Sequence, residues 1–231
     1  VYAQYSMGGN GDDEMTHRAN RYAALGVDFV AGNLELVGVV DWTDEAYGAT
    51  VVGKQGDTDI VDTKDRKDQY TINLGGSYDF GVAKAYLSAE YFKNANDVAG
   101  IVGVMDDAIE LADYVVPGDE TKLDALKDPT WGAYFDEFKG YGIAIGANVP
   151  AFGGNFVASL GYTDAEEENV DADVTAYSAT VGYTYPLSKR TNLYAVGGYN
   201  NREFKLNGHD TDFDKVEQDQ YQVIFGMVHK F

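Results

Sequence analysis

The chain has 231 residues and a formal charge of -21, with 38 acidic against 17 basic side chains. That charge repels a phosphate backbone and argues against nucleic-acid binding, and the absence of cysteine excludes both a disulfide framework and a Cys-ligated metal. No stretch approaches the roughly 18 consecutive apolar residues of a membrane-spanning helix. Membrane-spanning β-strands remain open, because a closed barrel satisfies its own backbone polar groups in lipid.

Segments of about ten residues with alternating apolar and polar side chains recur along the chain and match the length of a tilted transmembrane strand. Tight connections at 32–33, 81–82, 150–155 and 186–191 alternate with long polar ones. Outer-membrane barrels have short periplasmic turns and longer extracellular loops, so this rhythm predicts an all-β, antiparallel transmembrane barrel with both chain ends on the periplasmic side. The expected strands cover residues 1–7, 21–31, 34–42, 70–80, 83–92, 141–149, 156–163, 175–185, 192–200 and 220–231.

On one face of nearly every expected strand, formed by every second residue, an aromatic residue stands at each end and aliphatic or small residues stand between them. Aromatic girdles at two depths are typical of a lipid-facing surface. A soluble β-sandwich also has alternating strands, but it does not require aromatic residues at matched depths. The expected extracellular girdle is Trp42, Tyr70, Tyr91, Tyr141, Tyr162, Tyr177, Tyr199 and Tyr221, and the expected periplasmic girdle is Phe29, Phe80, Phe156, Tyr185 and Phe231.

The other face of the expected strands is polar and predicts a water-filled barrel interior. Fixed carboxylates in a narrow passage attract cations and repel anions, so this face predicts a preference for cations. The candidate pore-lining residues are Asp28, Glu35, Asp41, Asp79, Lys84, Glu90 and Lys230.

The connection at about 94–140 differs from the others because apolar residues recur in it at helical spacing and Pro117-Gly118 follows them. We expect a helix there. Either the apolar stripe packs this extracellular loop against itself or the barrel rim, or the loop narrows the pore. The second interpretation brings an acidic set to the mouth, namely Asp106, Asp107, Glu110 and Asp113.

Three further features point weakly to other chemistry. Asp210, Asp212 and Asp214 alternate and could present oxygens to calcium, but they lack the Gly and Glu of an EF-hand loop, and a solvated loop is the better interpretation. His17 and His209 lie beside acids in expected loops, so an omptin-like outer-membrane protease is an alternative, as is a structural or adhesive barrel. No segment resembles a nucleophile elbow. We therefore assign no catalytic residue, metal or cofactor.

The last strand, ending in His229-Lys230-Phe231, resembles the closing strand of Gram-negative outer-membrane porins. The Leu187-Ser188-Lys189-Arg190-Thr191 stretch resembles the turn before the penultimate strand of proteobacterial general diffusion porins. The resemblance implies a homotrimeric, non-enzymatic channel of about sixteen strands in the outer membrane of a Gram-negative bacterium. It also implies passive diffusion of small hydrophilic solutes and ions, contact with outer-membrane lipids and lipopolysaccharide, and recognition of Phe231 by the barrel-assembly machinery.

Length separates two forms of this architecture. At about 23 residues per strand, a sixteen-stranded barrel needs roughly 370 residues, and the chain has 231. Residues 1–231 are therefore either the C-terminal part of a larger porin, which we favour, or a complete ten-stranded barrel. In both forms they belong to a single barrel domain with a long extracellular insertion at about 94–140.

Overall fold

The structure, a computed structural model, describes residues 1–6, 21–44, 48–55, 58–64, 67–95, 98, 137–167, 172–206 and 215–230. Among these residues there is no helix long and apolar enough to cross a membrane. The strands are β1 (Tyr2–Ser6), β2 (Arg21–Ala31), β3 (Leu34–Asp44), β4 (Gly48–Gln55), β5 (Thr58–Lys64), β6 (Gln69–Asp79), β7 (Lys84–Ala95), β8 (Phe138–Ala151), β9 (Gly154–Glu167), β10 (Ala172–Ser188), β11 (Thr191–Leu206) and β12 (Lys215–His229).

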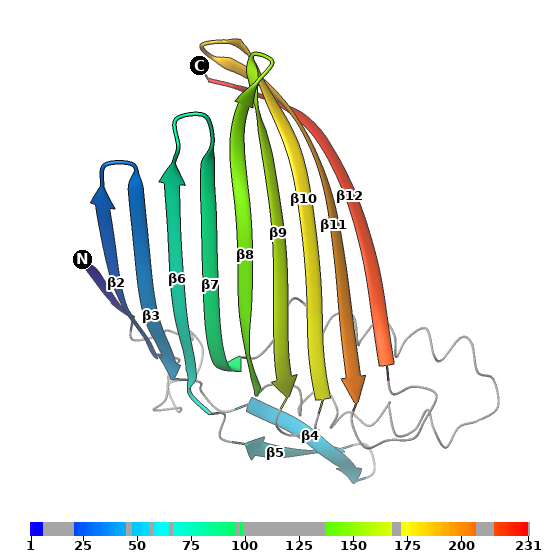
Figure 1. Cartoon of the computed structure of the whole chain (residues 1–231). Coiled ribbons are helices and arrows are strands. Elements are labelled where there is room, and N and C mark those ends of the chain that lie inside the picture. Colours follow the sequence, from blue (N-terminus) through cyan, green and yellow to red (C-terminus); the bar gives the residue numbers. More distant parts are fainter. Residues whose placement is uncertain are drawn as a thin grey trace, which may run out of the picture.

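Ten of these strands form one antiparallel sheet in which each strand pairs with its neighbours along the chain, in the order β1-β2-β3-β6-β7-β8-β9-β10-β11-β12. Figure 1 shows the sheet bent into a trough, with the short turns at one end and the longer connections at the other. Within the described residues the sheet is open, because β1 and β12 each pair with a single neighbour. The all-β antiparallel fold expected from the alternation is confirmed.

The register puts apolar side chains on one face of the sheet. Leu25 pairs with Val40, Val40 with Ile72, and Ile145 with Leu160, so aliphatic residues meet aliphatic residues across strand after strand. Side chains alternate between the two faces of the sheet along each strand. These aliphatic pairs therefore determine which face every other residue of the same strands occupies. The aliphatic face is largely exposed, as a surface made for lipid would be.

The turns that join the strands at the short end use residues with a specific backbone conformation. Gly32, Gly81 and Gly153 have positive φ angles, which glycine adopts at low cost. The Asp79 carboxylate accepts a hydrogen bond from the Gly81 N–H at 2.7 Å, and the Ser188 hydroxyl accepts one from the Arg190 N–H at 3.1 Å. Side chains of this type close tight turns. These contacts explain why the chain reverses within two or three residues here.

The structure corrects the expected strands in two ways. β4 and β5 form a separate two-stranded sheet where only a polar connection was expected. In addition, β10, β11 and β12 extend beyond the expected bounds at the end with the long connections; β12 begins at Lys215, not at Gln220. In these extensions the convex positions are polar, as at Glu203, Glu217 and Asp219, so the aliphatic stripe that marks the lipid face ends although the backbone ladder continues.

A buried apolar cluster lies where the strands leave the expected lipid band. Phe92, Phe138, Val174 and Phe204 are almost fully buried, and the pairings of Val174 with Ala165 and Phe204 bring them to one face. This is the face opposite to the aliphatic one, so the sheet also carries a compact apolar cluster on its polar side at this end. The strand rhythm alone did not predict this cluster.

Candidate functional site

The polar face of the sheet is the concave one, and its described carboxylates other than the buried Glu167 lie on the half formed by β2, β3, β6 and β7. Glu35 pairs in register with Ser77, whose hydroxyl donates to the Glu35 carboxylate at 3.3 Å. The Lys84 ammonium lies 3.6 Å from the same carboxylate. Asp41 on β3 pairs with Thr71 on β6. Glu90 lies on β7, the next strand after β6 in the sheet. Four of the expected pore-lining residues, Glu35, Lys84, Asp41 and Glu90, therefore lie on one continuous wall.

The other half of the concave face, on β8 to β12, presents hydroxyls and amides. One row of register partners runs from Gly161 through Ser178 and Asn200 to Gln220, and the next runs from Ser159 through Thr180 and Gly198 to Gln222. The β8 residues that face the same side are small. Among them are Gly142, Ala144 and Gly146, so at these positions β8 places no large side chain in the trough.

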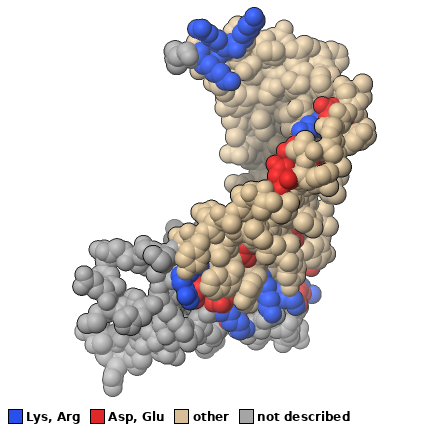
Figure 2. All heavy atoms as spheres, turned by 90° about the vertical axis from the view of Figure 1, so that its left-hand side faces the viewer, with Lys and Arg blue, Asp and Glu red and all other residues tan. Residues whose placement is uncertain are grey.

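A cavity of about 940 Å³ spans both halves of the concave face. Its lining includes Asn73 and Glu90 on one side and Thr180, Arg202 and Gln222 on the other. Figure 2 shows the molecule from its β1 edge, where the hollow of the trough is visible in profile. The concave side is thus an open passage along the strands, lined by polar side chains together with apolar ones such as Val37 and Val39.

Arg202 is the cationic group at the rim of this cavity. It lies in the same register row as Glu90, with Gly142, Thr163 and Ala176 between them. The Asn200 amide, in the orientation that satisfies both of its ends, accepts from the Arg202 guanidinium at 3.0 and 3.1 Å and donates to the Tyr177 carbonyl at 3.0 Å. Arg202 is thereby held on the wall opposite Glu90.

The convex face carries the expected aromatic girdle. Tyr162 and Tyr177 are register partners with ring centroids 5.1 Å apart, and Tyr199 and Tyr221 are partners at 5.0 Å. Tyr141 lies 6.2 Å from Tyr162. The rings therefore form a band along one edge of the aliphatic surface, and Trp42, Tyr70 and Tyr91 continue it across the other strands.

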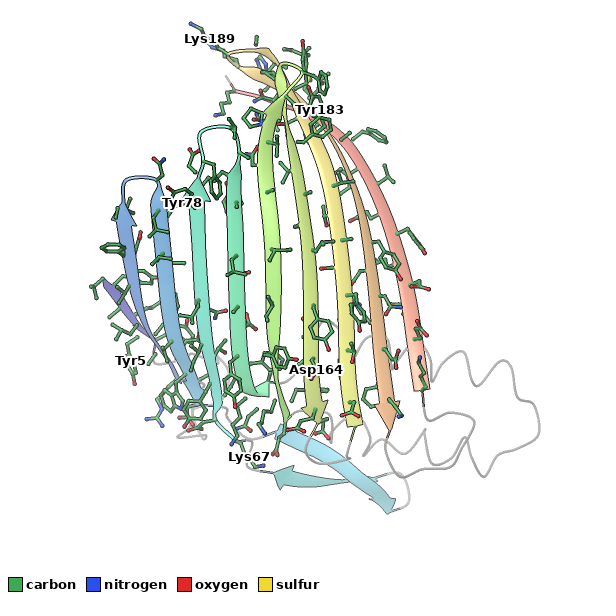
Figure 3. All side chains as sticks on the ribbon, in the orientation of Figure 1. Tyr5, Lys67, Tyr78, Asp164, Tyr183 and Lys189 are labelled. Atoms are coloured by element: carbon green, nitrogen blue, oxygen red, sulfur yellow. The ribbon has the colours of Figure 1, made fainter. Side chains whose placement is uncertain are left out.

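At the opposite edge, aromatic residues cluster at the short turns. The Phe156 and Tyr183 rings lie 4.6 Å apart, and the Tyr183 hydroxyl donates to the carbonyls of Ala151 and Phe152 at 3.1 and 3.0 Å. Phe80 packs edge-on against Tyr78 at 4.7 Å. Figure 3 shows Tyr183 and Lys189 together at this end of the sheet, with Lys67 and Asp164 at the other end. Phe29 and Tyr185 lie on the same face, paired with Leu36 and Leu193.

The remaining expected positions divide into two groups. Asp28 and Asp79 lie on the concave face near the short turns, because they pair with Val37 and Lys84. The Lys230 N–H donates to the Arg190 carbonyl at 2.8 Å and so lies at the same end. The other group lies outside the described residues, together with the helix expected in the long insertion. It comprises Asp106, Asp107, Glu110, Asp113, His17, His209, Asp210, Asp212, Asp214 and Phe231.

A set of polar contacts at the extracellular end was not expected from the sequence. The Trp42 indole N–H donates to the Asp68 carboxylate at 3.0 Å, and the Asn94 amide donates to the Asp68 carbonyl at 2.7 Å. The Lys67 ammonium lies 2.5 Å from the buried Glu137 carboxylate. These contacts link the starts and ends of β3, β6, β7 and β8, and their partners are too far apart in sequence for any local pattern to pair them.

Comparison with known proteins identifies the family. The family model described as Gram-negative porin matches residues 1–205. The chain belongs to the Gram-negative porin family. It is also 33% identical over 130 residues to an outer membrane porin protein of Bordetella pertussis, a match that covers 56% of this chain and 30% of that protein. The predicted Gram-negative porin family and the predicted outer-membrane location are confirmed.

Solved structures of outer-membrane proteins share the fold. In-vitro folded OmpT of Vibrio cholerae superposes with a TM-score of 0.57 and 16% identity over 97% of this chain. The anion-selective porin of Comamonas acidovorans superposes with a TM-score of 0.55 and 19% identity over 98%. The chain spans 58% and 54% of those two chains, that is, somewhat more than half of their length.

Proposed function

We propose that the trough is one wall of a water-filled channel through which small hydrophilic solutes and ions cross the outer membrane by passive diffusion. The observation that carries the proposal is the contrast between the two faces of one sheet. The convex face is aliphatic between two aromatic bands, and the concave face carries carboxylates, hydroxyls and amides along the middle of the strands. Lipid requires the first surface and water the second.

We also propose that the channel prefers cations. Among the described residues on the concave face of β2, β3, β6 and β7, the carboxylates of Asp28, Glu35, Asp41, Asp79 and Glu90 are accompanied by one cationic side chain, Lys84. Family membership does not supply the sign of selectivity, since the Comamonas acidovorans porin is anion-selective by name. The argument therefore rests on the fixed charges of this chain, which focus a negative potential in a passage with low-dielectric walls.

Planar-bilayer recording of protein purified from outer membranes tests both statements. A channel gives stepwise conductance, and a cation preference gives a reversal potential of cation-selective sign in a potassium chloride gradient. Replacing Asp41→Asn together with Glu90→Gln is expected to move that potential toward zero, whereas Val181→Ala on the convex face leaves it in place. An anion-directed potential in the unmodified protein contradicts the charge argument, and an absence of conductance contradicts the channel.

The same protein preparation separates a channel from the other classes. An omptin-like protease cleaves peptides without any membrane gradient, and a structural barrel gives neither cleavage nor conductance. His229, the one described histidine, hydrogen bonds through Nδ1 to the Thr191 hydroxyl at 2.9 Å. That contact joins register partners of the β11–β12 pair, which makes His229 part of the sheet.

The proposal includes the assembly that surrounds the trough. We infer a single barrel domain of about sixteen strands, to which residues 1–231 contribute ten in the sheet, and a homotrimer as in the general diffusion porins that the chain resembles. The open sheet and the greater length of the solved relatives support the larger barrel. Native mass spectrometry in detergent tests both, because it gives the protomer mass and the number of protomers.

A further inference from the structure

The charges of the concave face are segregated between its two halves. All five carboxylates named above belong to β2, β3, β6 and β7. On the concave positions of β8 to β12, the described charged residues are Glu167, which is buried at the extracellular end, Arg202 at the cavity rim, and Lys230 near the short turns. Between these ends the wall of β8 to β12 is electrically neutral along its middle, although it is polar.

The neutral middle is built as a lattice of groups that both donate and accept hydrogen bonds. Ser178 and Gln220 belong to one register row, and Ser159, Thr180 and Gln222 belong to the next. Neighbouring strands lie about 4.8 Å apart, so adjacent members of a row can reach different atoms of one small molecule. The rows flank the cavity, whose floor at Gly142, Ala144 and Gly161 leaves room above the backbone.

The chemistry of this lattice differs from that of the acidic half. A carboxylate only accepts hydrogen bonds, whereas a hydroxyl or a primary amide both donates and accepts. A sugar hydroxyl needs a partner of the second kind and gains nothing from a net potential. A cation, by contrast, is drawn to the acidic half. The volume of about 940 Å³ is in the range of small-molecule sites and leaves space for water around a bound solute.

We propose that the neutral half is a transient binding subsite for an uncharged polyhydroxylated solute such as a monosaccharide, beside the acidic half that cations follow. The inference rests on the proposed channel function and adds to it the class of solute and the residues that contact it. Binding there is weak, because conduction requires a site that the solute also leaves. Thr180 and Gln222, which flank Gly198 in one row, are the central contacts.

Glucose added to a conducting channel provides the test. A subsite makes the decrease in potassium chloride conductance saturate with glucose concentration after correction for the viscosity of the bulk solution. The double variant Thr180→Val and Gln222→Leu keeps the side-chain volumes and removes the hydrogen bonds. It is expected to weaken the apparent glucose affinity about fivefold or more, since two neutral hydrogen bonds are lost. Val181→Ala, on the opposite face of the same strand, is the matched control.

The acidic pair variant completes the comparison. Asp41→Asn with Glu90→Gln is expected to change the reversal potential more than the glucose affinity, and the Thr180 and Gln222 variant is expected to do the reverse. Persistent ion conductance in each variant demonstrates a folded channel. A decrease that never saturates, or equal effects of both variants on glucose affinity, overturns the subsite but not the channel. Absence of conductance from the unmodified protein overturns the channel and the subsite together.

Discussion

Phe152 is the residue whose conformation costs most among the described turns. Its φ is +52°, and the neighbouring Gly153 has +79°, so both central residues of this turn are left-handed. Turns of this kind favour Asn-Gly, because a bulky side chain in that conformation is strained. The Phe152 side chain is 87% exposed, so it gains little burial in return. Its ring contributes an edge-on contact at 6.3 Å with Phe156.

We predict that Phe152→Asn stabilises the barrel by about 1 kcal/mol, because relief of the left-handed strain outweighs one exposed ring contact. Urea unfolding followed by tryptophan fluorescence in detergent measures the change. Phe152→Ala serves as the control, since it removes the ring and keeps the strain. Equal stability of the Asn and Ala variants would indicate that the turn carries no strain worth relieving.

Strands at both edges of the sheet are joined by the same contact between a tyrosine and a glycine. A Cβ atom added to Gly26 would lie 2.0 Å from the Tyr2 ring, and one added to Gly226 would lie 2.3 Å from the Tyr194 ring. Each pair is also a register pair, Tyr2 with Gly26 and Tyr194 with Gly226. In each pair the tyrosine ring occupies the space that a side chain at the glycine would fill.

Gly226→Val is expected to displace the Tyr194 ring and to destabilise the β11–β12 pair by about 1–3 kcal/mol. Gly197→Val is the matched control, because nothing lies within 4 Å of the Cβ position at Gly197 and the same valine is introduced one strand away. Thermal unfolding by gel mobility in detergent compares the two variants with the unmodified protein. Similar losses in both would mean that valine is unfavourable in these strands in general.

Above the tyrosine girdle, the extracellular ends of β11 and β12 are tied by exposed charges on the convex face. Hydrogen bonds from the Tyr199 hydroxyl and the Asn201 amide lower the pKa of Asp219, and bonds from Asn201 and Lys215 lower the pKa of Glu217. Carboxyl groups whose pKa is lowered by folding stabilise the folded state above their unfolded pKa values of about 4, and this contribution is lost as the pH falls through the folded values.

Amide protection in this hairpin end is therefore expected to be constant near pH 7 and to decrease below about pH 4. Hydrogen exchange, expressed as protection factors, measures it for residues 199–203 and 217–221. The double variant Glu217→Gln and Asp219→Asn removes both titrating groups and should give a flatter profile. Since both carboxylates are exposed, the effect is local and decreases at high salt. A steeper loss in the double variant than in the unmodified protein contradicts this account.

The sequence predicted the elements far better than it predicted their ends. Alternation located β2 to the residue, because both of its ends coincide with a change from apolar to turn residues. It missed the first five residues of β12, from Lys215, where Glu217 and Asp219 face outward and no apolar partner marks the face. Contacts such as Trp42 with Asp68 join residues 26 apart. Pairings of this kind follow from the register of neighbouring strands in the sheet and not from any local pattern.

For the molecule as a whole, the alternation of side chains along each strand identified the polar face of the sheet. It did not show how charge is distributed across that face. Asp41 and Glu90 belong to strands that are distant in sequence, and they come to lie on one half because β3, β6 and β7 are neighbours in the sheet. Local sequence does not distinguish Arg202 from the other basic residues, whereas the register of the sheet places it in the row of Glu90. The order of the strands, and not the composition, creates an acidic half and a neutral half.

This separation makes ion preference dependent on salt, and that dependence is the prediction at the scale of the whole channel. A solute on the neutral wall senses the carboxylates of the opposite half only through the intervening electrolyte, whose screening length is about 30 Å at 0.01 M, about 10 Å at 0.1 M and about 3 Å at 1 M. Cation preference is therefore expected to be strong at 0.01 M potassium chloride and to fall severalfold by 1 M. Reversal potentials at a constant concentration ratio measure it, and Asp41→Asn with Glu90→Gln should reduce the dependence. A preference that is the same at all three concentrations would mean that cations are selected by direct coordination and not by the field of the acidic half.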